Sequence, residues 1–388
     1  MKTSLFACGF RVTFLAAGLA AVLLILAWAA SFTFGMPLGS RWPPTLWHGH
    51  EMMFGFVSAA VSGFLLTAVP SWTGQPGFAG RPLVLLATLW SAARVAVYVP
   101  VLPAWSIAMI DVSFLPALAV LIAPLLFRAK NRNWALLGVL LALAACNGVF
   151  HLALANGDAP TAERALHTAI NVMLVLATVI AGRIVPAFTT SALKARGRPA
   201  VLPNFPFMDR LTISLMVAIV ATDIRWPEGR IAAWLALAAS ASHLVRLSRW
   251  RTLSTWRDPI VWVLHVGYVW IPIGLTLKGV AILTGAAFAA FWLHALTVGA
   301  LTTLILGVMT RAALGHTGRP VEAAAPTTSA YVLLSAAALV RVFGLAATGS
   351  AYPAIILCAA LLWAAAFALF LGVYAPILAR PRVDGRPG

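Results

Sequence analysis

Apolar runs of membrane-spanning length recur along the chain, and short polar segments separate them. A transmembrane helix needs about 20 consecutive, mostly apolar residues, so we predict one spanning helix for each run. The expected spans are residues 12–34, 47–69, 82–101, 104–127, 134–155, 164–187, 208–225, 229–248, 258–283, 287–310, 330–349 and 352–378. No connection is long enough for a soluble domain. The pattern therefore predicts an all-α, polytopic membrane protein with twelve transmembrane helices, in which residues 1–388 form a single integral membrane domain.

Basic residues predict the orientation of these helices, because cytoplasmic loops carry an excess of Lys and Arg. One set of connections holds little beyond Arg41, Arg225 and Arg230. The opposite set, together with both termini, holds Lys2, Arg11, Arg81, Arg128, Lys130, Arg132, Lys194, Arg196, Arg198, Arg246, Arg249, Arg251, Arg257, Arg311, Arg319, Arg380, Arg382 and Arg386. We therefore expect both termini in the cytoplasm, with residues 379–388 as a short basic tail. The first run could also be read as a signal peptide, but its length favours an uncleaved helix.

Composition agrees with the membrane class and excludes two others. Hydrophobic residues make up 62% of the chain and charged residues 10%, whereas soluble domains are about half apolar and a quarter charged. The net charge of +17 does not indicate nucleic-acid binding, because the cations lie in short loops between apolar runs. Cys8, Cys146 and Cys358 form no CxxC pair, so we expect neither a disulfide framework nor a thiolate zinc site.

Histidines concentrate in the half of the membrane that this topology places outside. Five of the eight histidines lie there: His48, His50, His151, His167 and His294. The other three, His243, His265 and His316, lie in the inner half or in the cytoplasm. Ionisable groups inside a bilayer are costly and usually functional, and imidazole is the commonest metal ligand. The distribution predicts a metal or haem site in the outer half.

A faint repeat links three of the histidine-bearing spans. His50 is followed by Gly63 and by Thr73-Gly74 at the same intervals at which His294 is followed by Gly307 and by Thr317-Gly318. The sixth span begins with a third histidine, His167. These spans are four helices apart, so we predict three four-helix repeats, since weak internal symmetry is common in membrane folds.

Four motifs resemble the NnrS family. They are HGHEMMFGF with the following GFLLTAVPSWTG (48–74), GRIVPAFT (182–189), LHVGYVWI (264–271) and the run from His294 to Pro320. The resemblance implies a multi-pass protein of the bacterial inner membrane that contains haem, expected to be b-type, and copper. It also implies a link to nitric oxide metabolism, nitrosative stress and denitrification.

The arrangement is also similar to the catalytic subunit of haem-copper oxidases, whose metal histidines lie on helices 2, 6, 7 and 10. Here the seventh span has no histidine, and the tenth has only His294. A complete binuclear centre is therefore not expected. Whether the protein is an oxidoreductase acting on nitric oxide stays open, and so does its electron donor.

The chemistry of each polar residue and its predicted depth in the membrane suggest its role in the site. We expect His50 and His294 to bind haem axially, the alternative being a hydrogen bond between helices. The copper candidates are His48, His167 and His151. Glu51 can orient a histidine or relay protons. His265, with Tyr268 and His316, could form a second inner site, although we favour a simple hydrogen bond there.

Charged residues inside the spans complete the candidate list. Arg94 and Asp111 fall at similar depths and are expected to form an ion pair. Arg341 is a candidate partner for a haem propionate, which arginine binds in a bidentate manner. Arg183 lies near the inner end of its span and can extend to the interface.

The functional prediction is a haem-copper protein that binds or handles nitric oxide within the membrane lipid. The alternative is a secondary transporter or metal exporter that uses the buried charges and histidines. A third hypothesis is a scaffold that assembles other metalloenzymes.

Overall fold

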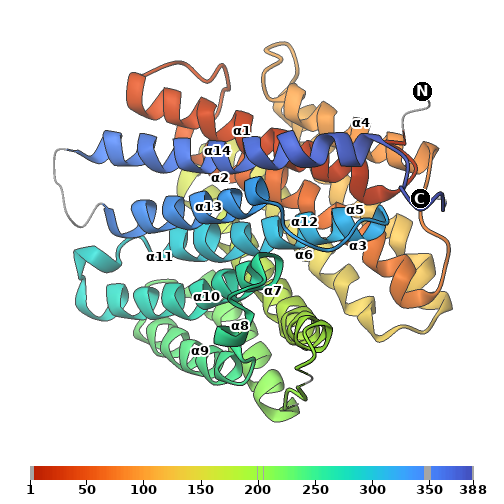
Figure 1. Ribbon diagram of the computed structural model, residues 1–388. Helices are drawn as coiled ribbons and strands as arrows, with labels where there is room; N and C mark the ends of the chain where they lie inside the picture. Colours follow the sequence, from red (N-terminus) through yellow and green to blue (C-terminus); the bar gives the residue numbers. More distant parts are fainter. Residues whose placement is uncertain (1–3, 199, 204, 345–350, 387–388) are drawn as a thin grey trace. The chain divides into compact units, whose positions relative to one another are not determined.

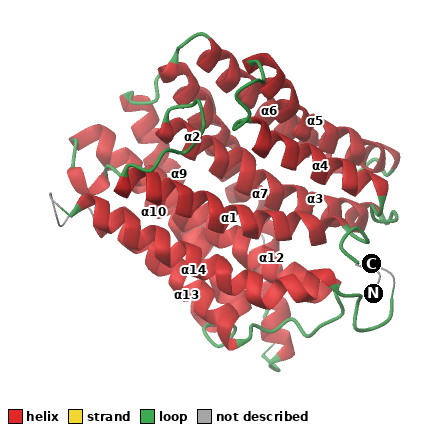
Figure 2. Cartoon of the chain, turned by 90° about the horizontal axis from the view of Figure 1, so that it is seen from above, coloured by secondary structure: helices red, strands yellow, loops and turns green. Residues whose placement is uncertain are grey.

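The computed structural model describes residues 4–198, 200–203, 205–344 and 351–386. Within these ranges all the regular elements are helical (Figure 2), which confirms the predicted fold class. The α-helices, labelled in Figure 1, are α1 (Gly9–Phe34), α2 (Pro44–His50), α3 (Ser58–Thr73), α4 (Arg81–Ala96), α5 (Ala104–Arg128), α6 (Ala135–Ala155), α7 (Ala159–Ala195), α8 (Pro206–Arg225), α9 (Arg230–Ser248), α10 (Pro259–Thr284), α11 (Trp292–His294), α12 (Thr303–His316), α13 (Ala325–Phe343) and α14 (Tyr352–Ala379). Two π-helical segments of the described chain continue α2 and α11: η1 (Glu51–Val57) and η5 (Ala295–Thr302).

Ten helical segments of the described chain are long and apolar enough to cross a membrane, so the protein is a multi-pass membrane protein. The two remaining predicted spans correspond to α4 and α8. Helix α4 has 16 residues and reaches only about 24 Å, less than the roughly 30 Å of a bilayer core. Helix α8 has 20 residues but carries charged residues at both ends. Twelve spans, and the side on which the termini lie, therefore remain predictions.

The chain divides into two compact units. Unit 1 comprises Met1–Ala169, Ala312–Pro320 and Phe367–Gly388, and unit 2 comprises Ile170–Arg311 and Val321–Ala366. Each unit is thus assembled from separate stretches of sequence.

Glycines bring helices into close contact inside each unit. In unit 1, a Cβ at Gly63 of α3 would lie 2.3 Å from the Thr13 hydroxyl of α1. In unit 2, a Cβ at Gly299 of η5 would lie 2.4 Å from the Trp270 ring of α10. Small residues allow such approach in membranes, where dispersion contacts rather than the hydrophobic effect hold helices together.

Two π-helices occur at corresponding places in the second and tenth predicted spans. Segment η1 begins directly after His50, and η5 begins directly after His294. The helices that follow them lead to Gly74 and Gly318, which both have positive φ angles. The shared geometry supports the proposed repeat between these two spans. The third proposed copy, around His167, lies in α7, which is α-helical throughout, so the three-fold repeat remains a prediction.

Candidate metal centre

Asp111 of α5 is the central residue of a polar cluster inside unit 1. Its Oδ2 atom lies 2.9 Å from His50 Nε2 of α2 and 2.9 Å from His151 Nε2 of α6. The same oxygen accepts a hydrogen bond of 2.8 Å from Asn147 Nδ2, one turn before His151 on α6. Three helices are therefore joined through a single carboxylate oxygen.

A second carboxylate, Glu51, completes the cluster. Its Oε1 atom accepts a hydrogen bond of 3.0 Å from Arg94 Nη1 of α4 and lies 3.1 Å from His50 Nδ1. Arg94 also pairs through Nη2 with Asp111 Oδ1, so the ion pair expected between Arg94 and Asp111 is present. Two buried carboxylates need two positive charges for balance, because an uncompensated charge in a low dielectric is costly. Arg94 supplies one, and the balance can come from a protonated His50 or His151, from a proton on one of the carboxyl groups, or from a metal ion.

Aromatic side chains enclose the cluster. The Phe150 ring stacks on the His50 ring with centroids 4.6 Å apart, and Trp42 meets His50 edge-on at 4.7 Å and His151 at 5.4 Å. His50 is 0% exposed and Asp111 3% exposed. The cluster is thus shielded from bulk solvent, which strengthens its electrostatic interactions.

The geometry allows a metal ion. His50, Asp111 and His151 each offer one ligand atom, and these atoms all lie within 4.8 Å of one another. Two imidazole nitrogens and one carboxylate oxygen form a donor set suited to divalent first-row metals. Without a metal, the same atoms form a hydrogen-bonded network that connects α2, α5 and α6, and Arg94 connects α4 to it.

Five sequence candidates meet here: His50, Glu51, Arg94, Asp111 and His151. Three others in unit 1 do not, and one of them, His316, has its ring 5.7 Å from the Phe10 ring. The His48 ring stacks on Trp28 at 4.6 Å, and the partly exposed His167 lies 3.9 Å from Glu163 Oε1.

The remaining candidates belong to unit 2, apart from His316. His265 uses both ring nitrogens, with Nε2 lying 2.8 Å from Thr189 Oγ1 and Nδ1 lying 3.0 Å from Thr252 Oγ1. This favours the hydrogen-bond interpretation of His265 over an inner metal site. His294 ends α11, and Arg183 is exposed on α7. Because His50 and His294 belong to different units, their predicted pairing remains a prediction.

The environment of Arg341 in α13 suits an anionic ligand. Its guanidinium lies over the Phe291 ring at 4.9 Å, just before α11. Its Nη1 atom is buried and has no hydrogen-bond acceptor among the described residues.

Sequence reasoning missed several polar residues. Asn147 lies four residues before His151 and therefore on the same face of α6, a spacing that could have identified it. In unit 2, Lys278 of α10 pairs with Asp223 Oδ2, which also accepts a hydrogen bond of 2.7 Å from Asn171 Nδ2. Lys278 is 1% exposed, and a lysine inside an apolar run is itself a signal of a buried partner.

The fold and the cluster define a class: a helical, multi-pass membrane protein with a buried histidine–carboxylate centre able to hold a metal. The family model described as NnrS protein matches residues 4–382. The chain belongs to this family, and the resemblance found in the motifs is confirmed. No curated protein matches the chain.

Proposed function

We propose that this protein is a membrane metalloprotein that handles nitric oxide, with a metal ion held by His50, Asp111 and His151. Membership of the NnrS family suggests a function related to nitric oxide. The observation that carries the proposal is the convergence of three buried ligand atoms within 4.8 Å.

Copper is the metal we assign to this centre. Imidazole binds copper well, and among divalent first-row ions Cu²⁺ is bound most tightly by a given nitrogen–oxygen site. Bound copper would supply a redox-active position at which nitric oxide can coordinate. Arg94 and Glu51 would hold the ligands in place, and Phe150 and Trp42 would limit the access of water.

The surroundings of His50 favour a metal ion over a haem. A porphyrin bound through Nε2 would need the space taken by Asp111 Oδ2 at 2.9 Å and Asn147 Oδ1 at 3.0 Å. We therefore assign the haem to unit 2, with His294 as a ligand and the buried Nη1 of Arg341, which has no acceptor among the described residues, available to a propionate.

We place the protein in the bacterial inner membrane, with its basic loops in the cytoplasm. A role in nitrosative stress or denitrification belongs to the same proposal, as implied by the resemblance to the NnrS family.

The test is the metal and haem content of the purified full-length chain, expressed with copper and haem in excess. We expect His151→Gln to weaken copper binding at least tenfold, since even residues that only support a ligand change affinity by about 10–100-fold. His167→Gln, a histidine outside the cluster, is the control and should leave copper unchanged. We expect His294→Ala to remove the haem bands of the reduced-minus-oxidised spectrum, with Arg183→Gln as the control.

Nitric oxide binding is then measured from spectral changes of the loaded protein and from consumption at a nitric oxide electrode. A folded wild-type protein that contains neither copper nor haem would overturn the proposal. Copper retained unchanged in His151→Gln would overturn the assignment of this centre.

A further inference from the structure

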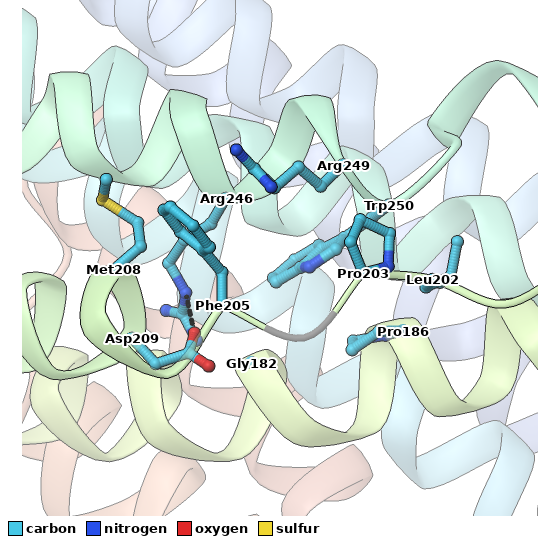
Figure 3. A pocket seen from close by; sticks show the side chains of 10 residues that line it. All are labelled: Gly182, Pro186, Leu202, Pro203, Phe205, Met208, Asp209, Arg246, Arg249 and Trp250. Atoms are coloured by element: carbon cyan, nitrogen blue, oxygen red, sulfur yellow. Dashed lines mark hydrogen bonds and ion pairs between the residues drawn. The ribbon is translucent and has the colours of Figure 1, made fainter.

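Unit 2 contains a small pocket, and none of its lining residues belongs to the candidate metal centre. It is lined by α7, the connection that precedes α8, the first turn of α8 and the end of α9 (Figure 3). Its volume is about 180 Å³, well below the roughly 300–1,000 Å³ of sites for drug-sized ligands. Such a volume suits a small ion or a headgroup fragment.

Arg246 presents an unused donor to this pocket. The residue is 4% exposed, its Nε atom donates to Asp209 Oδ1 at 2.8 Å, and its Nη1 atom donates to the Tyr268 hydroxyl at 3.0 Å. Nη2 has no hydrogen-bond acceptor among the described residues. A Cβ at Gly182 would lie 1.8 Å from Nη2, so the guanidinium fits only because residue 182 is glycine. The buried arginine is therefore held in place, it lines the pocket, and its Nη2 group has no acceptor among the described residues.

Arg249 adds a second guanidinium to the lining (Figure 3). Its guanidinium lies over the Phe205 ring at 4.0 Å and makes no hydrogen bond to the described residues. Stacking on an aromatic face leaves the in-plane N–H donors of arginine available.

The start of α8 adds a partial positive charge. Helix α8 begins at Pro206, and its N-cap residue Phe205 provides no side-chain cap. The first N–H groups of a helix lack intrahelical acceptors and carry the positive end of the helix dipole. Asp209 contributes the only carboxylate among the described lining residues, and it is already paired with Arg246. Two guanidiniums and a helix N-terminus thus leave the pocket with excess positive charge.

We propose that this pocket binds a phosphate-type oxyanion, either inorganic phosphate or the phosphodiester of an anionic lipid headgroup. The planar N–H fork of Arg249 matches phosphate oxygens, and the Nη2 group of Arg246 adds a further donor. The connections that follow α7 and α9, residues 194–198 and 249–257, contain several arginines and are predicted to lie at the cytoplasmic surface, where anionic lipids concentrate.

The test measures thermal unfolding of the full-length, delipidated chain in a neutral detergent. Inorganic phosphate is titrated against chloride at matched ionic strength, and nanodiscs of phosphatidylcholine are compared with and without phosphatidylglycerol. We expect a rise in the unfolding midpoint with at least one of the two phosphate sources. Arg249→Gln should weaken the apparent affinity about tenfold or more, because a hydrogen bond to a charged group is lost.

Two further variants make the test specific. Arg251→Gln removes an exposed arginine of the same connection that does not line the pocket, and it should bind as wild type does. Asp209→Asn removes the competing carboxylate and should strengthen binding.

A response to phosphatidylglycerol alone assigns the site to a lipid headgroup, and a response to phosphate alone assigns it to the free ion. No response to either source, or equal losses in Arg249→Gln and Arg251→Gln, would overturn the proposal.

Discussion

The charged residues of the candidate metal centre depend on one another. Arg94 contacts Glu51 Oε1 at 3.0 Å and also pairs with Asp111, and both carboxylates are almost fully buried. Removing one partner of a buried ion pair leaves an uncompensated charge, which costs more than the pair contributes when intact. Similar depth along two helices was enough to predict the Arg94–Asp111 pair. The participation of Glu51 in the same pair could not be predicted, because sequence spacing does not show which way a side chain at a helix start turns.

Replacement of Arg94 tests this dependence. We expect Arg94→Leu to lower the free energy of unfolding by about 3–5 kcal/mol, because two buried carboxylates lose their guanidinium. Adding Glu51→Gln should recover part of the loss, since one of those charges is then removed. The measurement is equilibrium unfolding in detergent, with the exposed Arg164→Leu as control. Purely additive losses in the double variant would contradict the coupling.

At the scale of elements, the π-helix η1 positions α4 and its arginine beside the candidate metal centre. The Gly55 carbonyl accepts a hydrogen bond of 3.0 Å from Trp90 Nε1 of α4, and a Cβ at Gly55 would lie 3.1 Å from Arg94 Nη1. The segment thus positions α4 and leaves room for the arginine. Hydropathy predicted the span from residue 47 to 69, but not the π-helix, because a shift in hydrogen-bond register leaves no trace in an apolar run. Segments of this kind often mark functional sites.

Close contact between α1 and α3 is tested by filling the space at Gly63. We expect Gly63→Ala to lower the free energy of unfolding by about 1–3 kcal/mol, since the added methyl group would overlap Thr13 and Phe14. Gly138→Ala on α6 is the matched control, because a Cβ there meets nothing within 4 Å. It should be neutral or slightly stabilising. Equal effects of the two substitutions, measured by thermal unfolding, would show that α1 and α3 do not meet at Gly63.

For the whole molecule, metal binding and stability are expected to be linked. His50, Asp111 and His151 come from three helices of unit 1, so an ion bound to all three would favour the folded state. A ligand that binds only the folded state adds about 2.7 kcal/mol when its concentration is 100 times its Kd.

Copper should therefore raise the unfolding temperature of the metal-depleted protein in a dose-dependent manner, and a chelator should reverse the rise. In His151→Gln the rise should be greatly reduced, because one ligand is missing. Magnesium is the control ion and should have little effect, since it prefers oxygen ligands. The same rise in His151→Gln as in wild type would place the stabilising copper elsewhere.

The sequence by itself determined the helical membrane class, because apolar runs of spanning length leave the backbone no other way to satisfy its hydrogen bonds in lipid. Its motifs were also enough to indicate the family. Apart from the Arg94–Asp111 pair, only the tertiary structure decided which polar residues meet. Residues 50, 111 and 151 lie far apart in the chain, and their convergence depends on helix rotation and packing. The pocket around Arg246 also depends on packing between residues far apart in the chain. Its buried guanidinium fits because residue 182, 64 positions earlier, is glycine.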